Sequence, residues 1–243
     1  MKSNILFLGV IGVMISCGAV AQDSSRFYAG AGYGVVTIAE EEGISFSDAN
    51  NGFIQLGYKI TENFAIEGQY SKSTKDASAN FSATDMDVSE LWWATMVELN
   101  PGMTMSEARS YFPYAQAEID MNIDASIETT AIYGVYRSSG NVYFKAKAGY
   151  LREEATLTSH INSMDFYVVD SNYQATEFSL AKGDEGFEEF SRDAQISVSE
   201  SESGFSAGLG LGYKFNDRFF SELEYTMVSE DLDMYSLSIN FAF

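Results

Sequence analysis

The sequence of 243 residues is poor in cysteine, proline, histidine and basic residues. It contains one cysteine, two prolines, one histidine, and 14 Lys and Arg residues against 35 Asp and Glu residues. A formal net charge of -21 at pH 7 argues against nucleic acid as a partner, because its phosphate backbone is also anionic. A single cysteine, Cys17, excludes an intramolecular disulfide and a zinc site built from several cysteines.

Residues 22–243 also lack a long hydrophobic run. No segment there approaches the roughly eighteen consecutive apolar residues that a transmembrane helix needs. A chain without such a helix can still reside in a membrane as a closed β-barrel, whose backbone groups are paired between strands. The 18 phenylalanines, 15 tyrosines and 20 glycines suit a single β-rich domain of this kind.

The first 21 residues are predicted to be a cleaved signal peptide. Lys2 gives a positive start, Ile5–Ile15 are apolar but too short to span a bilayer, and Ala19-Val20-Ala21 is a small-residue cleavage site. The competing interpretation is a lipoprotein cut at Cys17, although the residues before Cys17 fit a lipobox poorly. Cleavage after Ala21 would remove Cys17 and leave residues 22–243 as one barrel domain.

The clearest strand pattern lies at Tyr235–Phe243. Side chains of a strand alternate between its two faces, so one face of this segment is apolar and the other is small or polar. A transmembrane barrel strand has this character, with apolar residues facing lipid and aromatic residues at the membrane interfaces. The same alternation, applied to every strand, assigns apolar side chains to lipid and polar side chains to the interior.

One strand-turn-strand unit occurs twice. LGYKITENFAIEGQYS at Leu56–Ser71 aligns without a gap on LGYKFNDRFFSELEYT at Leu211–Thr226. Each copy has a short polar turn and a glutamate at the same offset, Glu67 or Glu222, on the face expected to point inward. Repeated hairpins of this kind are the building units of an up-and-down barrel.

The remaining strands are predicted from the same alternation. The expected ranges are Arg26–Ile38, Gly52–Ile60, Phe64–Lys75, Ala115–Arg137, Val142–Leu151, Ser203–Phe215 and Phe219–Val228, followed by a hairpin at Asp231. The strand Ala115–Arg137 would be about 75 Å long at roughly 3.3 Å per residue. Because about ten residues cross a membrane, part of this strand is expected to stand above it.

The two LGYK hairpins, the Lys145-Ala-Lys-Ala-Gly-Tyr150 strand and the final YSLSINFAF resemble the small outer-membrane β-barrel family, of the OmpA-membrane-domain and OmpX type. The resemblance covers most predicted strands and none of the long outer loops. It implies an antiparallel up-and-down transmembrane β-barrel in the outer membrane of a Gram-negative bacterium. It also implies contact with lipopolysaccharide and recognition of Phe243 by the barrel-assembly machinery. A monomer is expected.

The segment Asp76–Tyr114 leaves the number of strands open. Ser89–Leu99 starts with a cap residue, and Thr104-Met-Ser-Glu107 resembles a capping box for a second short helix. This interpretation, which we favour, gives eight strands and long, partly helical extracellular loops. The alternative takes Leu91–Leu99 and Tyr111–Met121 as an extra strand pair and gives ten, also an even number.

Five charged residues are predicted to point into the barrel. They are Glu67, Glu222 and Glu224, and Lys145 and Lys147. Buried charges need partners, and the two sets are complementary, so we expect a plugged lumen. The competing interpretation is a charged permeation path, although an eight-stranded barrel is narrow.

Most of the 35 acidic residues fall outside the lumen and the short turns, in the outer loops and projecting strands. One interpretation is a solvated, self-repelling surface. Another is a rim of carboxylates that binds Ca²⁺ or Mg²⁺, but no spacing matches an EF-hand loop. No specific metal-binding or cofactor-binding residue is therefore predicted.

Enzymatic activity is not expected. Barrel enzymes of the outer membrane place a histidine with serine or aspartate at the extracellular rim. The only histidine here, His160, is predicted just beyond the strand Val142–Leu151, near Ser159, Ser163 and Asp165, with no catalytic motif around it. No catalytic residue is predicted.

The favoured function is that of a structural or surface-interaction protein with a plugged lumen. Aromatic residues of the outer segments could meet a partner at the cell surface or pack within the insertion: Trp92, Trp93, Phe166, Tyr167, Phe187 and Phe190. The alternative is a conduit for small hydrophobic solutes, as in OmpW-like barrels. That alternative would need an apolar lumen, which the inward charges oppose.

Overall fold

The computed structural model describes residues 26–40, 44–181, 184 and 195–243. In chain order the elements are β1 (Phe27–Ile38), β2 (Ala49–Lys59), β3 (Phe64–Lys75), β4 (Ala77–Asp87), α2 (Ser89–Leu99), α3 (Met105–Tyr111), β5 (Tyr114–Arg137), β6 (Val142–Val169), β7 (Ala175–Ala181), β8 (Ser197–Lys214), β9 (Phe219–Met227) and β10 (Leu232–Ala242). The predicted signal peptide lies outside the described residues.

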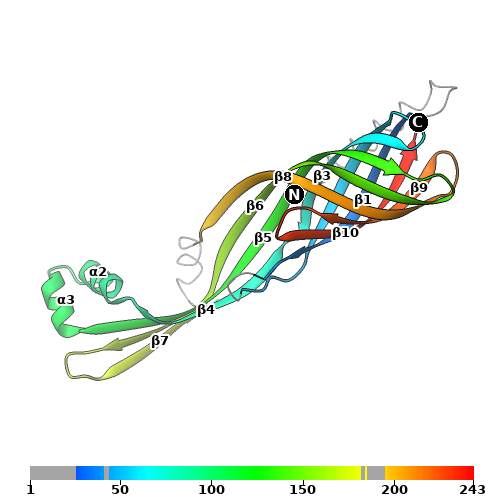
Figure 1. Ribbon diagram of the computed structural model, residues 1–243. Helices are drawn as coiled ribbons and strands as arrows, with labels where there is room; N and C mark the ends of the chain where they lie inside the picture. Colours follow the sequence, from blue (N-terminus) through cyan, green and yellow to red (C-terminus); the bar gives the residue numbers. More distant parts are fainter. Residues whose placement is uncertain (1–25, 41–43, 182–183, 185–194) are drawn as a thin grey trace. The chain divides into compact units, whose positions relative to one another are not determined.

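Eight of the strands form a closed antiparallel ring (Figure 1). The order around it is β5-β3-β2-β1-β10-β9-β8-β6, and pairing of β5 with β6 closes it. The β1–β10 register runs without a shift from Tyr28 opposite Ala242 to Ile38 opposite Leu232. The predicted eight-stranded barrel is therefore confirmed. Two strands that the sequence did not predict, β4 and β7, extend the sheet beside β5 and β6.

Three short turns and the end of β10 lie together at one end of the barrel, called here the turn end. The Arg137 N–H donates to the Asn63 carbonyl at 2.8 Å, and the Lys214 N–H donates to the Asn141 carbonyl at 2.8 Å. The N–H of Phe243 donates to the carbonyl of Phe27 at 2.8 Å, and their rings stack at 6.3 Å. These bonds tie all the hairpins at this end into one rim.

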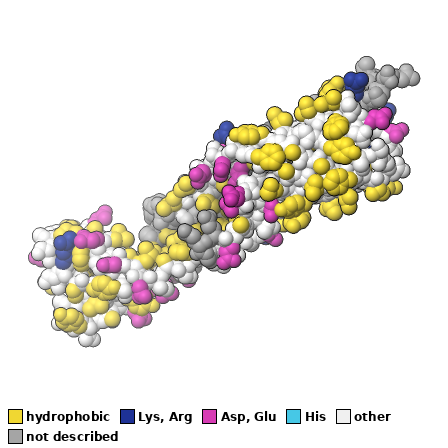
Figure 2. Space-filling view, in the orientation of Figure 1, with side chains coloured by type: hydrophobic (Ala, Val, Ile, Leu, Met, Phe, Trp, Pro, Cys, Tyr) yellow, Lys and Arg dark blue, Asp and Glu magenta, His cyan; other side chains and the backbone are white. Residues whose placement is uncertain are grey.

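The outside of the barrel is apolar. Figure 2 shows hydrophobic side chains over its outer face, and exposed members come from all eight ring strands: Tyr33, Leu56, Ile66, Ile132, Phe144, Leu209, Leu223 and Ile239. Such a surface faces acyl chains in a transmembrane barrel. The predicted assignment of apolar side chains to lipid is confirmed on β2, β3 and β6, where Leu56, Ile66 and Phe144 are exposed.

Strand β5 departs from the rule that apolar side chains face lipid. Ile132 is 65% exposed, whereas its neighbours Ala131, Tyr133 and Val135 are buried inside the ring. The assignment of apolar side chains to lipid is wrong on this strand. The interior of a small barrel must be filled by side chains, and on β5 large apolar side chains fill it. The hydroxyl of Tyr133 finds a partner inside, the Ser206 hydroxyl at 3.1 Å.

The described chain divides into two compact units. The barrel unit comprises the described residues within 26–77, 125–156 and 199–243, and the second unit comprises those within 78–124 and 157–198. The predicted long strand, observed as β5, is divided between the units at Asp124. Strand β6 continues past the predicted end at Leu151, as far as Val169.

The second unit contains α2 and α3, so the helical interpretation of the segment before β5 is correct. The capping box of α3 is present: the Glu107 N–H donates to Thr104 Oγ1 at 3.3 Å, and the Thr104 N–H donates to Glu107 Oε2 at 2.8 Å. Ser89 is not the cap of α2, whose N-cap is Val88. Of the helices in the described ranges, none is long and apolar enough to cross a membrane.

Aromatic side chains hold the second unit together. The Trp92 ring of α2 stacks on Phe178 of β7 at 5.4 Å and lies 6.1 Å from Phe166 of β6. Trp93 Nε1 donates to the Phe112 carbonyl at 2.6 Å. Several aromatics considered for a partner surface thus pack this unit, whereas Phe187 and Phe190 lie outside the described residues.

Candidate functional site: the charged cluster in the barrel lumen

The five charges predicted to point inward do so. Glu67 of β3, Glu222 and Glu224 of β9, and Lys145 and Lys147 of β6 are all buried within the ring. Their positions follow from strand alternation, because each lies one residue away from an exposed apolar side chain on the same strand.

Lys145 is the centre of the cluster. Its Nζ lies 3.2 Å from Glu67 Oε1, 2.9 Å from Glu222 Oε2 and 2.8 Å from Glu224 Oε2. An ammonium group has three donors, so these three carboxylates satisfy it completely. Lys147 pairs with Glu224, donates to Gln69 Oε1 at 3.1 Å, and lies 4.3 Å from the centre of the Tyr133 ring.

Arg137, the last residue of β5, is a sixth member that the sequence analysis missed. Its Nε lies 2.7 Å from Glu222 Oε1 and its Nη2 lies 3.0 Å from Glu67 Oε2. Its Nη1 donates to the Tyr28 hydroxyl at 2.9 Å. Arg137 lies on the face of β5 that carries Tyr133 and Val135, and the sequence pattern alone would assign that face to lipid.

The cluster contains three carboxylates and three cations, so its formal charge is zero. Burying unpaired charges in a low-dielectric interior costs several kcal/mol per ion, whereas good ion-pair geometry and hydrogen bonds offset that cost. Each charged group here has at least two polar partners. The arrangement can hold the strands together and fill the lumen. It offers no unpaired charge to a passing ion.

Two tyrosines extend the cluster in matching ways. The Tyr28 hydroxyl donates to Glu67 Oε2 at 2.8 Å, and the Tyr143 hydroxyl donates to Glu222 Oε1 at 2.8 Å. Tyr28 covers Gly57 and Tyr143 covers Gly212, the glycines of the two LGYK sequences. The ring order puts β2 and β8 four strands apart, on opposite walls. The sequence repeat is therefore a structural repeat across the barrel.

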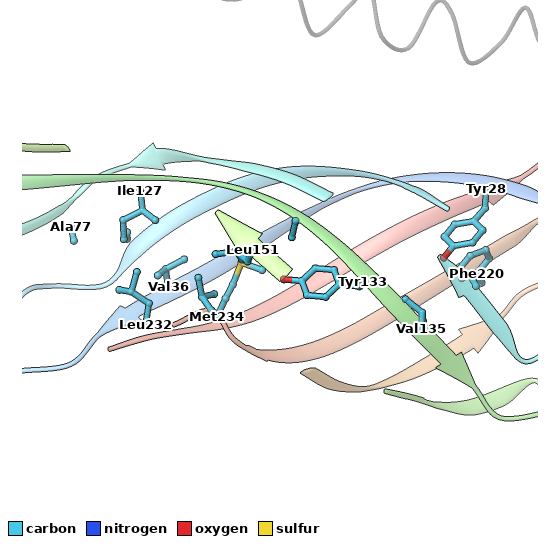
Figure 3. Close-up of a cluster of buried hydrophobic side chains, with 14 of the residues drawn as sticks. Tyr28, Val36, Ala77, Ile127, Tyr133, Val135, Leu151, Phe220, Leu232 and Met234 are labelled. Atoms are coloured by element: carbon cyan, nitrogen blue, oxygen red, sulfur yellow. The ribbon is translucent and has the colours of Figure 1, made fainter. Parts of the chain in front are cut away.

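Uncharged polar groups line the lumen beside the cluster. Gln55 Nε2 donates to Asn240 Oδ1 at 2.6 Å, and the Ser71 and Thr129 hydroxyls lie 2.8 Å apart. Nearer the end opposite the turn end, apolar side chains enter the interior, namely Val36, Ile127, Leu151, Leu232 and Met234. Figure 3 shows these side chains and, farther along the barrel, Tyr28 and Phe220 of the same cluster.

His160 lies within β6, not beyond the strand as predicted. Its Nε2 is 3.5 Å from Asp124 Oδ2, and both side chains are well exposed. Among the residues described, no group of three or more His, Cys, Asp or Glu side chains could hold a metal ion. The acidic residues Glu41, Glu42, Glu185, Glu188, Glu189 and Asp193 lie outside the described ranges.

Residues 5–243 match the family described as outer membrane protein beta-barrel domain. No curated protein matches the chain. Among solved structures, it is similar to Ail, the attachment invasion locus protein of Yersinia pestis, at 11% identity and a TM-score of 0.42, covering 89% of this chain and 95% of Ail.

The N-terminal β-barrel domain of Pseudomonas aeruginosa OprF is similar at 11% identity and a TM-score of 0.42, covering 91% of this chain and 100% of that domain. Neisserial surface protein A is similar at 10% identity and a TM-score of 0.42, covering 91% of this chain and 100% of that protein.

Proposed function

Because this chain belongs to the outer membrane protein β-barrel domain family and lies in the outer membrane, we propose that it is a barrel with a plugged lumen. In this proposal it acts as a structural and surface-interaction protein, and it is neither a pore nor an enzyme. The observation that carries the proposal is the neutral cluster of six buried charges across the lumen.

Two features of the barrel interior support the proposal that ions do not pass through it. An eight-stranded ring is narrow enough for side chains to fill it. An ion passing through would have to separate Lys145 from its three carboxylates and then cross the apolar group around Leu232 and Met234. Neither region offers a replacement for the ion's hydration shell.

The same features argue against a conduit for small hydrophobic solutes. Such a path needs a continuous apolar lumen, whereas buried Glu67, Lys145 and Glu222 interrupt it. His160 supports no hydrolytic chemistry in this proposal, because its ion-pair partner is an exposed carboxylate of the second unit.

The second unit is proposed as the part that meets the cell exterior, with the acidic outer segments forming a charged, hydrated surface. An extended segment of a partner could add to the edge of β4 or β7, the two strands at the ends of the sheet. Lipopolysaccharide around the barrel and the barrel-assembly machinery acting on Phe243 complete the set of proposed partners. Normal assembly of a Phe243→Ala variant in cells would contradict the last of these.

Conductance measurement tests the plug. The refolded wild-type protein, inserted into a planar lipid bilayer, is expected to give no stable current steps. A matched variant, Lys72→Gln, removes a cation from the exposed Lys72–Glu128 pair and should behave identically. Steady current through the wild type would overturn the plug, and flux of a hydrophobic solute into liposomes would favour the conduit.

A further inference from the structure

A cavity of about 600 Å³ opens at the turn end of the barrel. It is lined by the β2–β3 turn, the ends of β5 and β8, and the start of β6 and β9. Its floor is the charged cluster, since Arg137 and Tyr143 belong to both. All of its lining residues lie in the barrel unit.

The charge of this cavity is opposite to that of the protein. Three basic residues outside the neutral cluster line it, namely Arg26, Lys59 and Lys214, against two acidic residues, Glu62 and Asp217. Both acidic residues are exposed on the turns. Although the protein has 35 acidic and only 14 basic residues, basic residues outnumber acidic ones around this opening of the barrel.

The two lysines occupy equivalent positions of the repeat. Lys59 ends the first LGYK sequence and Lys214 ends the second. Because β2 and β8 lie on opposite walls, the two ammonium groups approach the cavity from opposite sides. The sequence repeat therefore builds a two-sided cationic mouth.

These lysines differ from those of the cluster in their partners. Lys145 and Lys147 are paired with carboxylates, but neither Lys59 nor Lys214 forms an ion pair with any residue in the described ranges. Lys214 Nζ lies 5.4 Å from the centre of the Tyr143 ring, and both lysines are half-buried. Arg26 is held at the rim, where its Nη1 donates to the Tyr58 hydroxyl at 3.4 Å.

From this arrangement we propose that the turn-end cavity binds a phosphate group between Lys59 and Lys214. Lysine ammonium groups bind phosphate as point charges, and two of them on opposite walls can each contact a different oxygen of one phosphate group. Charge-assisted hydrogen bonds strengthen where water is partly excluded, as it is above the buried cluster. The phosphate can belong to a lipid headgroup or to a soluble phosphate.

Calorimetry on the full-length mature protein in a non-ionic maltoside detergent tests the proposal. One arm titrates inorganic phosphate, and the other titrates dihexanoyl-phosphatidylglycerol below its micelle concentration. We expect binding that weakens as salt is added, because it rests on charge. The double variant Lys59→Gln/Lys214→Gln should bind at least about tenfold more weakly, given the strength of charge-assisted bonds.

The matched control is Lys72→Gln/Arg152→Gln, which removes two exposed cations away from the cavity and should bind like the wild type. Heat-modified gel mobility checks that every variant is folded. Tighter binding of the lipid would identify a headgroup as the source, and equal binding would identify the phosphate group alone. Absence of binding in both arms, or equal binding by wild type and double variant, would overturn the site.

Discussion

Glu67 shows what one buried charge does in the lumen. It is inaccessible to solvent and accepts from Tyr28, Arg137 and Lys145. Replacement by glutamine leaves two buried cations with one fewer counter-charge, so Glu67→Gln should lower the free energy of unfolding by about 3–5 kcal/mol. Replacement by lysine should impair folding outright, without opening a conductance. Urea unfolding in lipid vesicles, followed by tryptophan fluorescence, measures the glutamine variant.

An exposed ion pair provides the control for that experiment. Glu128 pairs with Lys72 at 3.0 Å on the outside, where both side chains are solvated. Glu128→Gln should change the free energy of unfolding by less than about 1 kcal/mol. Equal losses in the two variants would mean that burial of the cluster is not what makes Glu67 important.

Most residues of the cluster could be predicted from the alternation of side chains along each strand, because that alternation fixes which side chains point inward. The inward position of Arg137 could not be predicted in this way. Arg137 shares its face with Tyr133 and Val135, and apolar side chains on a barrel strand are assigned to lipid unless the packing inside the ring is known. Tyr28 was missed for the same reason, since only the ring shows that it covers Gly57 and reaches Glu67.

At the scale of the element, the repeated hairpins depend on two glycines. A Cβ added to Gly57 would lie 1.9 Å from Tyr28 Cζ, and one added to Gly212 would lie 2.1 Å from Tyr143 Cζ. Alanine at either position must displace a tyrosine that bonds a cluster glutamate, so a loss of about 1–3 kcal/mol in unfolding free energy is expected. The same urea titration measures it.

Gly68 is the matched position. The nearest atoms to an added Cβ are 4.0 Å away, so Gly68→Ala should be close to neutral. If Gly68→Ala were as damaging as Gly57→Ala, the loss would not come from the tyrosine contact.

Helix α3 should show a pH dependence through its capping box. Hydrogen bonds from the backbone and hydroxyl of Thr104 hold the pKa of Glu107 below its usual value. A lowered pKa in the folded state means that the stabilisation is present above the usual glutamate pKa and is lost as the pH falls through the lowered one. Hydrogen exchange of the α3 amides, corrected for intrinsic rate, should therefore show less protection in acid.

Thr104→Ala removes the cap and should lower that protection roughly fivefold at neutral pH, in line with the usual effect of an N-cap residue. Glu107→Gln removes the titrating carboxyl group and should lose the acid dependence. Persistence of the dependence in Glu107→Gln would assign it to another group.

The helices and the eight ring strands could be predicted because each carries a local pattern: a cap, a capping box or strict alternation. Strands β4 and β7 have a weaker local pattern. The β4 sequence ASANFSATDMD offers a single large apolar side chain before Met86, and β7 pairs only with the far end of β6. β4 and β7 form by pairing with the edges of β5 and β6, and a local sequence pattern does not reveal which strand edges are available for pairing.

At the scale of the whole molecule, the proposed orientation puts the α2–α3 connection outside the cell and the turn end in the periplasm. A protease recognition site inserted between Gly102 and Met103, in a tight exposed turn, should be cut when intact cells are treated. The same site inserted at Asp217 should be protected until the outer membrane is permeabilised. Cleavage of the second site alone on intact cells would reverse the orientation.

The neutral cluster draws its members from β3, β5, β6 and β9. β6 contributes two cations and β9 contributes two carboxylates, and β8 lies between these strands, so a sheet that lacked either of them would present unpaired charges to the bilayer. Insertion of β6 and β9 should accordingly be coupled, because each strand cancels the charge of the other.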